Sequence, residues 1–166
     1  MNLDTARLNA ANHFYCIFRN NLYPMPQSPE NTKNHQDNYI PVDTSVEKIA
    51  RLVVDAAYTV HVNLGPGLLE KVYEICFCHE LEKRGLNYKR QVDIPIVYDN
   101  LTFNEGLRLD VLVEDCIICE LKALETINPV WEAQVLSHLK LTGKRLGFLI
   151  NFNGIRIKDG IRRFLV

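Results

Sequence analysis

The residues best suited to chemistry in this chain lie on two short apolar runs, Leu107 to Val113 and Cys116 to Lys122. Asp110 interrupts the first run, and Glu120 and Lys122 end the second. Both runs are rich in Val, Ile and Leu, as expected of strands that are buried on both faces. A buried charge destabilises a fold by several kcal/mol unless it is paired or bound to a metal. We therefore expect these charges to serve a function.

The side-chain pattern selects the register of the hairpin that these runs predict. A two-residue turn at Glu114-Asp115 would set polar residues against apolar ones on both faces, whereas a turn that also includes Cys116 leaves one face entirely apolar. In that second register the pairs are Asp110–Glu120, Arg108–Lys122 and Leu112–Ile118 on one face, and Leu109–Leu121, Val111–Cys119 and Val113–Ile117 on the other. A slip of one residue would move every side chain to the opposite face, so we predict the second register.

This register brings two carboxylates and a lysine together. Directly opposite residues have Cβ atoms about 5 Å apart, which makes Asp110 and Glu120 neighbours. Adjacent carboxylates repel each other, and a hard divalent cation such as Mg²⁺, or alternatively Mn²⁺, relieves that repulsion. Lys122 shares the face of Glu120 and could orient a water molecule or stabilise developing negative charge.

Composition and charge narrow the function classes. The chain has 166 residues, is 47% hydrophobic and 23% charged, and carries a net charge of −1, which predicts one packed domain without a basic coat. From Lys140 onward basic residues outnumber Asp159, which suits a phosphate-bearing partner but also an ordinary solvated surface. No run reaches the roughly 18 apolar residues of a membrane span, and no apolar signal segment is present. The odd number of cysteines favours reduced thiols and a cytoplasmic location.

The pattern along the chain predicts an extension and one domain. Residues 1–41 form the extension, which we expect to be flexible, with a short helix around Ala6 to Phe18. Residues 42–166 form the domain. Its predicted helices cover 46–60, 68–83 and 129–141, and its predicted strands cover 88–97, a short run through 103, 107–113, 116–122, 145–152 and 155–158. The order indicates an α/β fold in which helices flank a mixed sheet.

Several short motifs resemble those of the GxxExxY protein family, which is placed in the PD-(D/E)xK nuclease-like superfamily. The motifs are Gly67-x-x-Glu70-x-x-Tyr73, Arg108-x-Asp110, Glu120-Leu121-Lys122, Glu132-Ala133-Gln134 and Leu149-Ile150-Asn151-Phe152-Asn153. The resemblance spans roughly Val46 to Val166. It implies a restriction-endonuclease-like core of α-β-β-β-α-β type. Leu109 stands where the superfamily name has proline.

The resemblance also implies roles for individual residues. Asp110 and Glu120 would bind Mg²⁺, Lys122 would assist the attacking water, Glu70 would add or orient a ligand, and Gln134 would support the site. We expect three further residues to contact substrate: Arg108, Tyr73 and His138. For Tyr73 and His138 the alternative is a buried side chain with a purely structural role.

The expected activity is Mg²⁺-dependent hydrolysis of phosphodiester bonds in DNA or RNA. Two alternatives remain open: a catalytically silent nucleic-acid-binding or protein-interaction module of the same fold, and a non-nuclease metal hydrolase. The number of metal ions is left open, and so is the oligomeric state, for which a homodimer is one option.

Overall fold

The computed structural model describes residues 41–103, 106–126 and 128–166. Residues Val42–Val166 make up one compact unit. The helix predicted around Ala6 to Phe18 and the rest of the extension through residue 40 lie outside the described residues. Within the described residues, no helix has both the length and the apolar character needed to cross a membrane.

Two helices precede a run of five strands in the unit, and side-chain caps fix the starts of two of its helices. The elements are α2 (Thr44–Leu64), α3 (Glu70–Lys83), β1 (Tyr88–Asp93), β2 (Ile96–Tyr98), β3 (Leu101–Phe103), β4 (Arg108–Val113), β5 (Ile117–Lys122), α4 (Pro129–Thr142), β6 (Leu146–Asn151), α5 (Ile157–Gly160) and β7 (Ile161–Leu165). Asp43 begins α2 by accepting a hydrogen bond from the Ser45 N–H, and Asn128 begins α4 in the same way. Gly143 ends α4 in the left-handed conformation that glycine adopts without strain.

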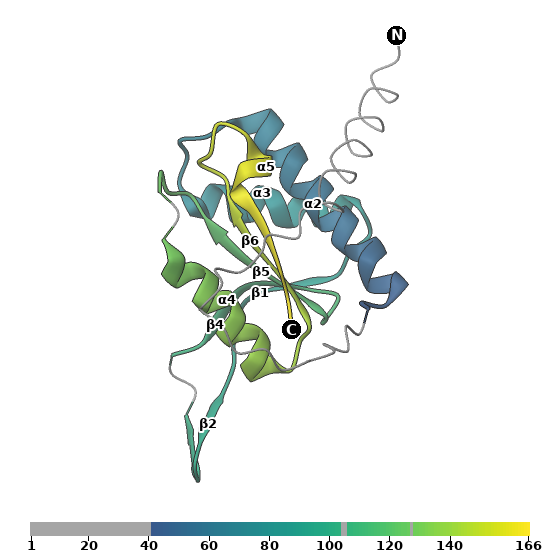
Figure 1. Cartoon of the computed structure of the whole chain (residues 1–166). Helices are drawn as coiled ribbons and strands as arrows, with labels where there is room; N and C mark the ends of the chain where they lie inside the picture. Colours follow the sequence, from purple (N-terminus) through teal and green to yellow (C-terminus); the bar gives the residue numbers. More distant parts are fainter. Residues whose placement is uncertain (1–40, 104–105, 127) are drawn as a thin grey trace, which may run out of the picture. The chain divides into compact units, whose positions relative to one another are not determined.

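A five-stranded mixed sheet with the order β1-β4-β5-β6-β7 forms the centre of the unit (Figure 1). All neighbouring strands are antiparallel except β5 and β6, which are parallel and are joined through α4. Val135 and Leu139 of α4 pack in one cluster with Ile118 of β5. The next residue, Cys119, interacts electrostatically with Cys78 of α3. Since successive strand residues point to opposite faces, α4 covers one face of the sheet and α3 the other. The predicted fold class is confirmed.

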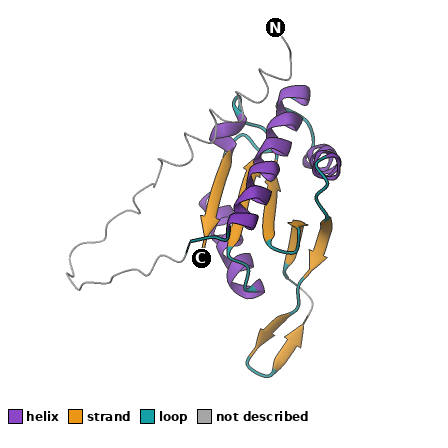
Figure 2. Cartoon of the chain, turned by 90° about the vertical axis from the view of Figure 1, so that its right-hand side faces the viewer, coloured by secondary structure: helices purple, strands orange, loops and turns teal. Residues whose placement is uncertain are grey.

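The structure corrects the prediction of one strand over residues 88–97. β1 ends at Asp93, and β2 pairs with β3 in a separate two-stranded sheet. This hairpin turns at the predicted Asp99-Asn100 and extends away from the main sheet (Figure 2). Pro95 is the local sign of this break, because proline cannot donate a hydrogen bond to the strand ladder.

The prediction of a final strand over residues 155–158 is wrong. Residues Ile157–Gly160 form α5, and the last strand is β7, which pairs with β6. A Cβ atom on Gly160 would lie only 2.2 Å from the Asn151 carbonyl oxygen, so glycine permits α5 to approach the end of β6. A helix of one turn is too short to show a helical period in the sequence.

The β4–β5 hairpin has the predicted register over three pairs, Val111–Cys119, Leu112–Ile118 and Val113–Ile117. The ladder stops before Asp110 and Glu120, so the predicted pairs Asp110–Glu120, Arg108–Lys122 and Leu109–Leu121 do not form. Leu109 instead joins the cluster under α4 together with Leu112, although strict alternation would place these two residues on opposite faces. The alternation therefore breaks next to Asp110, and the facing strand carries a positive φ of 51° at Gln91.

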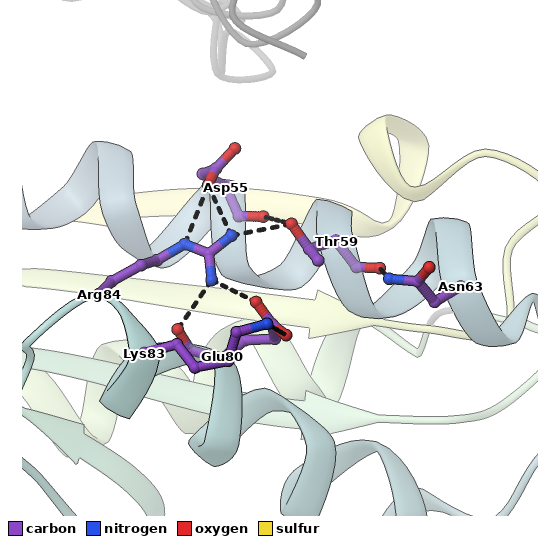
Figure 3. Close-up of polar contacts among 6 residues, drawn as sticks. All are labelled: Asp55, Thr59, Asn63, Glu80, Lys83 and Arg84. Carbon is purple, nitrogen blue, oxygen red and sulfur yellow. Dashed lines mark hydrogen bonds and ion pairs between the residues drawn. The ribbon is translucent and has the colours of Figure 1, made fainter. Parts of the chain in front are cut away.

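Arg84 joins α3 to α2 through a set of polar contacts at one side of the unit (Figure 3). Its Nε and Nη2 donate to Asp55 Oδ2 at 2.9 and 2.7 Å, and Nη2 also donates to Thr59 Oγ1 at 2.8 Å. Its Nη1 donates to the Glu80 backbone carbonyl at 2.8 Å and to the Glu80 carboxylate. Because the Arg84 side chain is only 15% exposed, these contacts are shielded from water. They fix the orientation of the two helices that lead into the site.

We expect Arg84→Met to lower the free energy of unfolding by about 2–3 kcal/mol, because it removes the charged hydrogen bonds that Arg84 donates to Asp55 and Glu80. Arg108→Met is the matched control. Arg108 pairs with Asp93 at 2.7 Å, but both side chains are more than half exposed, so its loss should lower the stability much less than the loss of Arg84. Urea denaturation of the two variants measures the difference, and equal losses would contradict the structural role of Arg84.

Candidate active site at the open end of the β4–β5 hairpin

The site lies where β4 and β5 separate, at the end of the hairpin away from the turn at residues 114–116. Here the Asp110 side chain replaces the missing backbone ladder, since its Oδ2 accepts a hydrogen bond from the Leu121 N–H at 2.9 Å. β5 remains paired with β6 up to Lys122–Asn151, so it stays anchored on that side. The separation of the strands thus places the Asp110 carboxylate between them, while β4 stays paired with β1 and β5 stays paired with β6.

Lys122 connects the two carboxylates that the sequence analysis singled out. Its Nζ donates to Glu120 Oε1 at 2.6 Å and to the Leu121 carbonyl at 2.9 Å, and it lies 3.9 Å from Asp110 Oδ2. The Lys122 side chain is 13% exposed, and the Glu120 side chain is 1% exposed. Burial by itself would lower the pKa of Lys122, but the neighbouring carboxylates raise it and keep the amine charged. The predicted cluster of Asp110, Glu120 and Lys122 is therefore present in the fold.

The second oxygen of Glu120 faces His138 on α4. Glu120 Oε2 lies 3.5 Å from His138 Nδ1, and neither of these buried atoms has a hydrogen-bond partner. Burial raises the pKa of Glu120 to about 7, and the charge of Asp110 adds to this rise against the hydrogen bond from Lys122. Burial also lowers the pKa of His138. His138 thus lies buried against the Glu120 carboxylate, and the substrate contact expected of it stays a prediction.

Glu70 reaches the same cluster from the start of α3. Its carboxylate accepts a hydrogen bond from the Ala123 backbone and interacts electrostatically with Lys122 and Asp110. Burial raises the pKa of Glu70, and the charge of Asp110 adds to this rise, against the Lys122 ammonium and the Ala123 hydrogen bond, which lower the pKa. Its place in the first turn of the helix, where the dipole favours the ionised form, also opposes the rise. The structure thus brings Glu70 to the cluster, as the resemblance implied.

Tyr73 and Arg108, which we expect to contact substrate, make their hydrogen bonds outside the carboxylate cluster. Tyr73 has no exposed surface: its hydroxyl donates to the Gly65 carbonyl at 2.7 Å, and its ring stacks on Phe152 at 4.8 Å. It therefore supports the loop between α2 and α3. Arg108 pairs with Asp93 on β1, because the register sets these two residues opposite each other. The substrate contacts expected of Tyr73 and Arg108 stay predictions.

Gln134 and the basic residues near the C-terminus stand apart from the cluster. Gln134 lies half-buried on α4, one turn before His138, and no hydrogen bond within the described residues joins it to Asp110, Glu120 or Lys122. The arginines expected to attract phosphate are engaged in ion pairs, namely Arg156 with Asp159, Arg162 with Glu132 and Arg163 with Glu47. Two of these three partners, Glu132 and Glu47, are distant in sequence from their arginines.

Two asparagines at the end of β6 hold the loops around the site. The buried Asn151 side chain accepts from the Leu124 N–H at 3.1 Å and donates to the Leu124 carbonyl at 2.8 Å. Asn153 Oδ1 accepts from the Gly67 N–H at 2.8 Å. Sequence reasoning included both residues in a motif but gave them no role. The feature of the sequence that could have indicated this role is the pair of amide side chains at the end of a strongly apolar strand.

A groove of about 890 Å³ lies beside the cluster. Its lining residues come from the loop before α3, the loop after β5, the start of α4 and the end of β6: Gly67, Leu68, Ala123, Leu124, Glu125, Thr126, Asn128, Pro129, Trp131 and Asn153. Ala123 belongs both to the groove and to the hydrogen bond with Glu70, so the groove begins next to the carboxylates. The site therefore has space for a ligand at one side.

The donor atoms of the cluster suit a hard divalent cation. Mg²⁺ is bound in proteins through one or two carboxylates and keeps several water ligands. Asp110 and Glu120 provide two carboxylates, and Glu120 Oε2 lacks a hydrogen-bond partner. Among the described residues no group of three or more His, Cys, Asp or Glu side chains is close enough to hold a metal ion. The fit therefore rests on the two carboxylates together with water.

We expect Glu120→Gln to make the stability of the protein less dependent on pH. A carboxyl group whose pKa is higher in the folded than in the unfolded chain stabilises the fold most below the unfolded pKa, and this contribution disappears as the pH rises through the folded pKa. For Glu120 this contribution disappears between pH 4.5 and about pH 7. Over this range the free energy of unfolding of wild type should fall by on the order of 3 kcal/mol relative to that of the variant. Urea denaturation at pH 4.5 and 8 measures this difference, with Glu125→Gln as the exposed control, and parallel curves for Glu120→Gln and wild type would contradict the burial of the charge.

Comparison with known proteins identifies the family. No curated protein and no solved structure matches the chain. A family model described as the PD-(D/E)XK nuclease superfamily matches residues 47–164, which cover more than half of the chain and include every residue of the cluster. Members of this superfamily are typically nucleases that use divalent metals. The chain therefore belongs to the PD-(D/E)XK nuclease superfamily.

Proposed function

We propose that this protein is a divalent-metal-dependent nuclease of the GxxExxY type, which hydrolyses phosphodiester bonds in DNA or RNA. The observation that carries the proposal is the convergence of Asp110 and Glu120 on the ammonium of Lys122 in a nearly buried place. A fold gains no stability from two buried like charges, so their presence beside a groove favours a chemical role.

Each residue of the cluster has a role in this proposal. Asp110 and Glu120 would hold Mg²⁺ or Mn²⁺, which when bound supplies Lewis-acid activation of a water molecule and of the phosphate. Lys122 donates hydrogen bonds at the same place and would orient the attacking water or stabilise the negative charge that develops on a phosphate oxygen. Glu70 would help to position these groups from the start of α3. His138 would hold Glu120 in place from behind.

A catalytically silent module of the same fold is the second candidate. One observation favours it: the arginines near the C-terminus are engaged with carboxylates, whereas proteins that bind nucleic acid without sequence preference usually present basic surfaces. Binding of nucleic acid without cleavage would identify this alternative.

Cleavage assays test the proposal. Plasmid DNA, single-stranded DNA and RNA should be cleaved with Mg²⁺ or Mn²⁺ and remain intact with EDTA. Asp110→Asn and Lys122→Ala should each lower the rate at least 100-fold, since each removes a group that acts on the reacting atoms. Asp115→Asn is the matched control. Asp115 lies on the same hairpin but pairs with Lys89 at the exposed turn, so this variant should cleave like wild type. Cleavage that persists unchanged in Lys122→Ala would show that another protein is responsible.

Metal binding can be measured separately from cleavage. Mg²⁺ or Mn²⁺ should raise the melting temperature of wild type, because a ligand that binds only the folded state stabilises it. The double variant Asp110→Ala, Glu120→Ala should show no such increase. Equal increases in both proteins would place the metal elsewhere.

A further inference from the structure

We propose that the groove beside the carboxylate cluster binds an unpaired nucleobase, with Trp131 as its stacking surface. The inference rests on the proposed function and adds to it the class of substrate: a nucleic acid whose bases are unpaired near the bond to be cleaved.

The charge of the groove decides which part of a nucleic acid it suits. Among the described residues that line it, Glu125 is the only charged one, and none is a lysine or arginine. A phosphate group would therefore find no cation there and would be repelled by Glu125. A nucleobase is uncharged, so it meets no such repulsion.

The chemistry of the lining matches a flat aromatic ring with polar edges. Leu68 and Leu124 contribute apolar surface, and both are substantially exposed at 41% and 49%. Trp131 is half-buried and packs against the apolar cluster under α4, so part of its indole ring is held by the core and part remains accessible. Asn153 and Asn128 are held in place through their Oδ1 atoms. Such a mixture of a rigid aromatic ring, apolar sides and a few fixed polar groups is typical of sites for small aromatic groups.

The position of the groove connects it with the reaction. Ala123 lines the groove, follows Lys122 directly, and donates its backbone hydrogen bond to Glu70. On α4, Trp131 at the groove and His138 behind Glu120 are two helical turns apart on one face. A nucleotide whose phosphate lies at the cluster would thus have its base at the groove. In a duplex the face of that base is stacked and its edge is paired, so only an unpaired base can enter.

The intrinsic fluorescence of the protein reports this contact directly, because Trp131 is the single tryptophan of the chain. The full chain in EDTA is titrated with a 12-nucleotide single strand of DNA or RNA, with the matching blunt duplex, and with an abasic strand of the same length. The single strands should quench the emission, whereas the duplex and the abasic strand should not. Equal quenching by the abasic strand would overturn the inference, since binding would then depend on the backbone alone.

Variants assign the contact to the groove. Stacking of one base on an aromatic side chain contributes about 1–3 kcal/mol, so Trp131→Leu should raise the Kd of a labelled single strand at least fivefold and leave the weak binding of the abasic strand unchanged. Because Trp131 also packs against the core, Leu124→Ala provides a second variant on the exposed rim. Its matched control is Val130→Ala, which alters an exposed apolar residue outside the groove. Leu124→Ala should weaken binding and Val130→Ala should not, and equal effects would overturn the inference.

The outcomes separate this inference from the proposed function. Cleavage that requires Lys122 but shows no quenching and no effect of Trp131→Leu would overturn the base site and leave the nuclease proposal standing. Quenching by single strands without any metal-dependent cleavage would support the base site and overturn the nuclease proposal.

Discussion

The structure around the site depends on the burial of the Glu120 charge. At 1% exposure this carboxylate is stable only because Lys122 donates to one oxygen, and its second oxygen faces the imidazole of His138 without a hydrogen bond. Lys122 Nζ also lies 3.9 Å from Asp110 Oδ2. The interrupted ladder and the break in alternation at Leu109 lie next to these charges, whereas the crossover through α4 follows from the parallel pairing of β5 and β6.

The surroundings of the cluster are held by uncharged contacts. The Tyr73 hydroxyl, the Asn153 amide and the Asn151 amide each bond to the backbone of a loop that borders the site. These bonds fix the loop before α3 and the loop after β5 from opposite sides. Because the supporting groups are neutral and largely buried, they hold their geometry without adding charge to a place that already contains three carboxylates.

Much of the arrangement could be predicted from local pattern. The alternation of apolar residues gave the register of the hairpin through Val111–Cys119, and helical spacing gave the helices predicted over 46–60 and 129–141, which correspond to α2 and α4. The positions of Arg108 and Tyr73 could not be derived in this way. Asp93 faces Arg108 only because β1 pairs with β4, and Gly65 accepts from Tyr73 only because α3 folds back under the loop.

The sequence by itself determined which side chains are unusual for their strands, and hence that Asp110, Glu120 and Lys122 belong together. It also determined the α/β fold class, because the periods of helix and strand are local properties. Only the tertiary structure decided that α5 replaces a predicted strand, that the C-terminal arginines are paired, and that a groove with little charge opens beside the cluster. The physical reason is that each of these features depends on contacts between residues that are distant in sequence and become neighbours only when the sheet and helices pack.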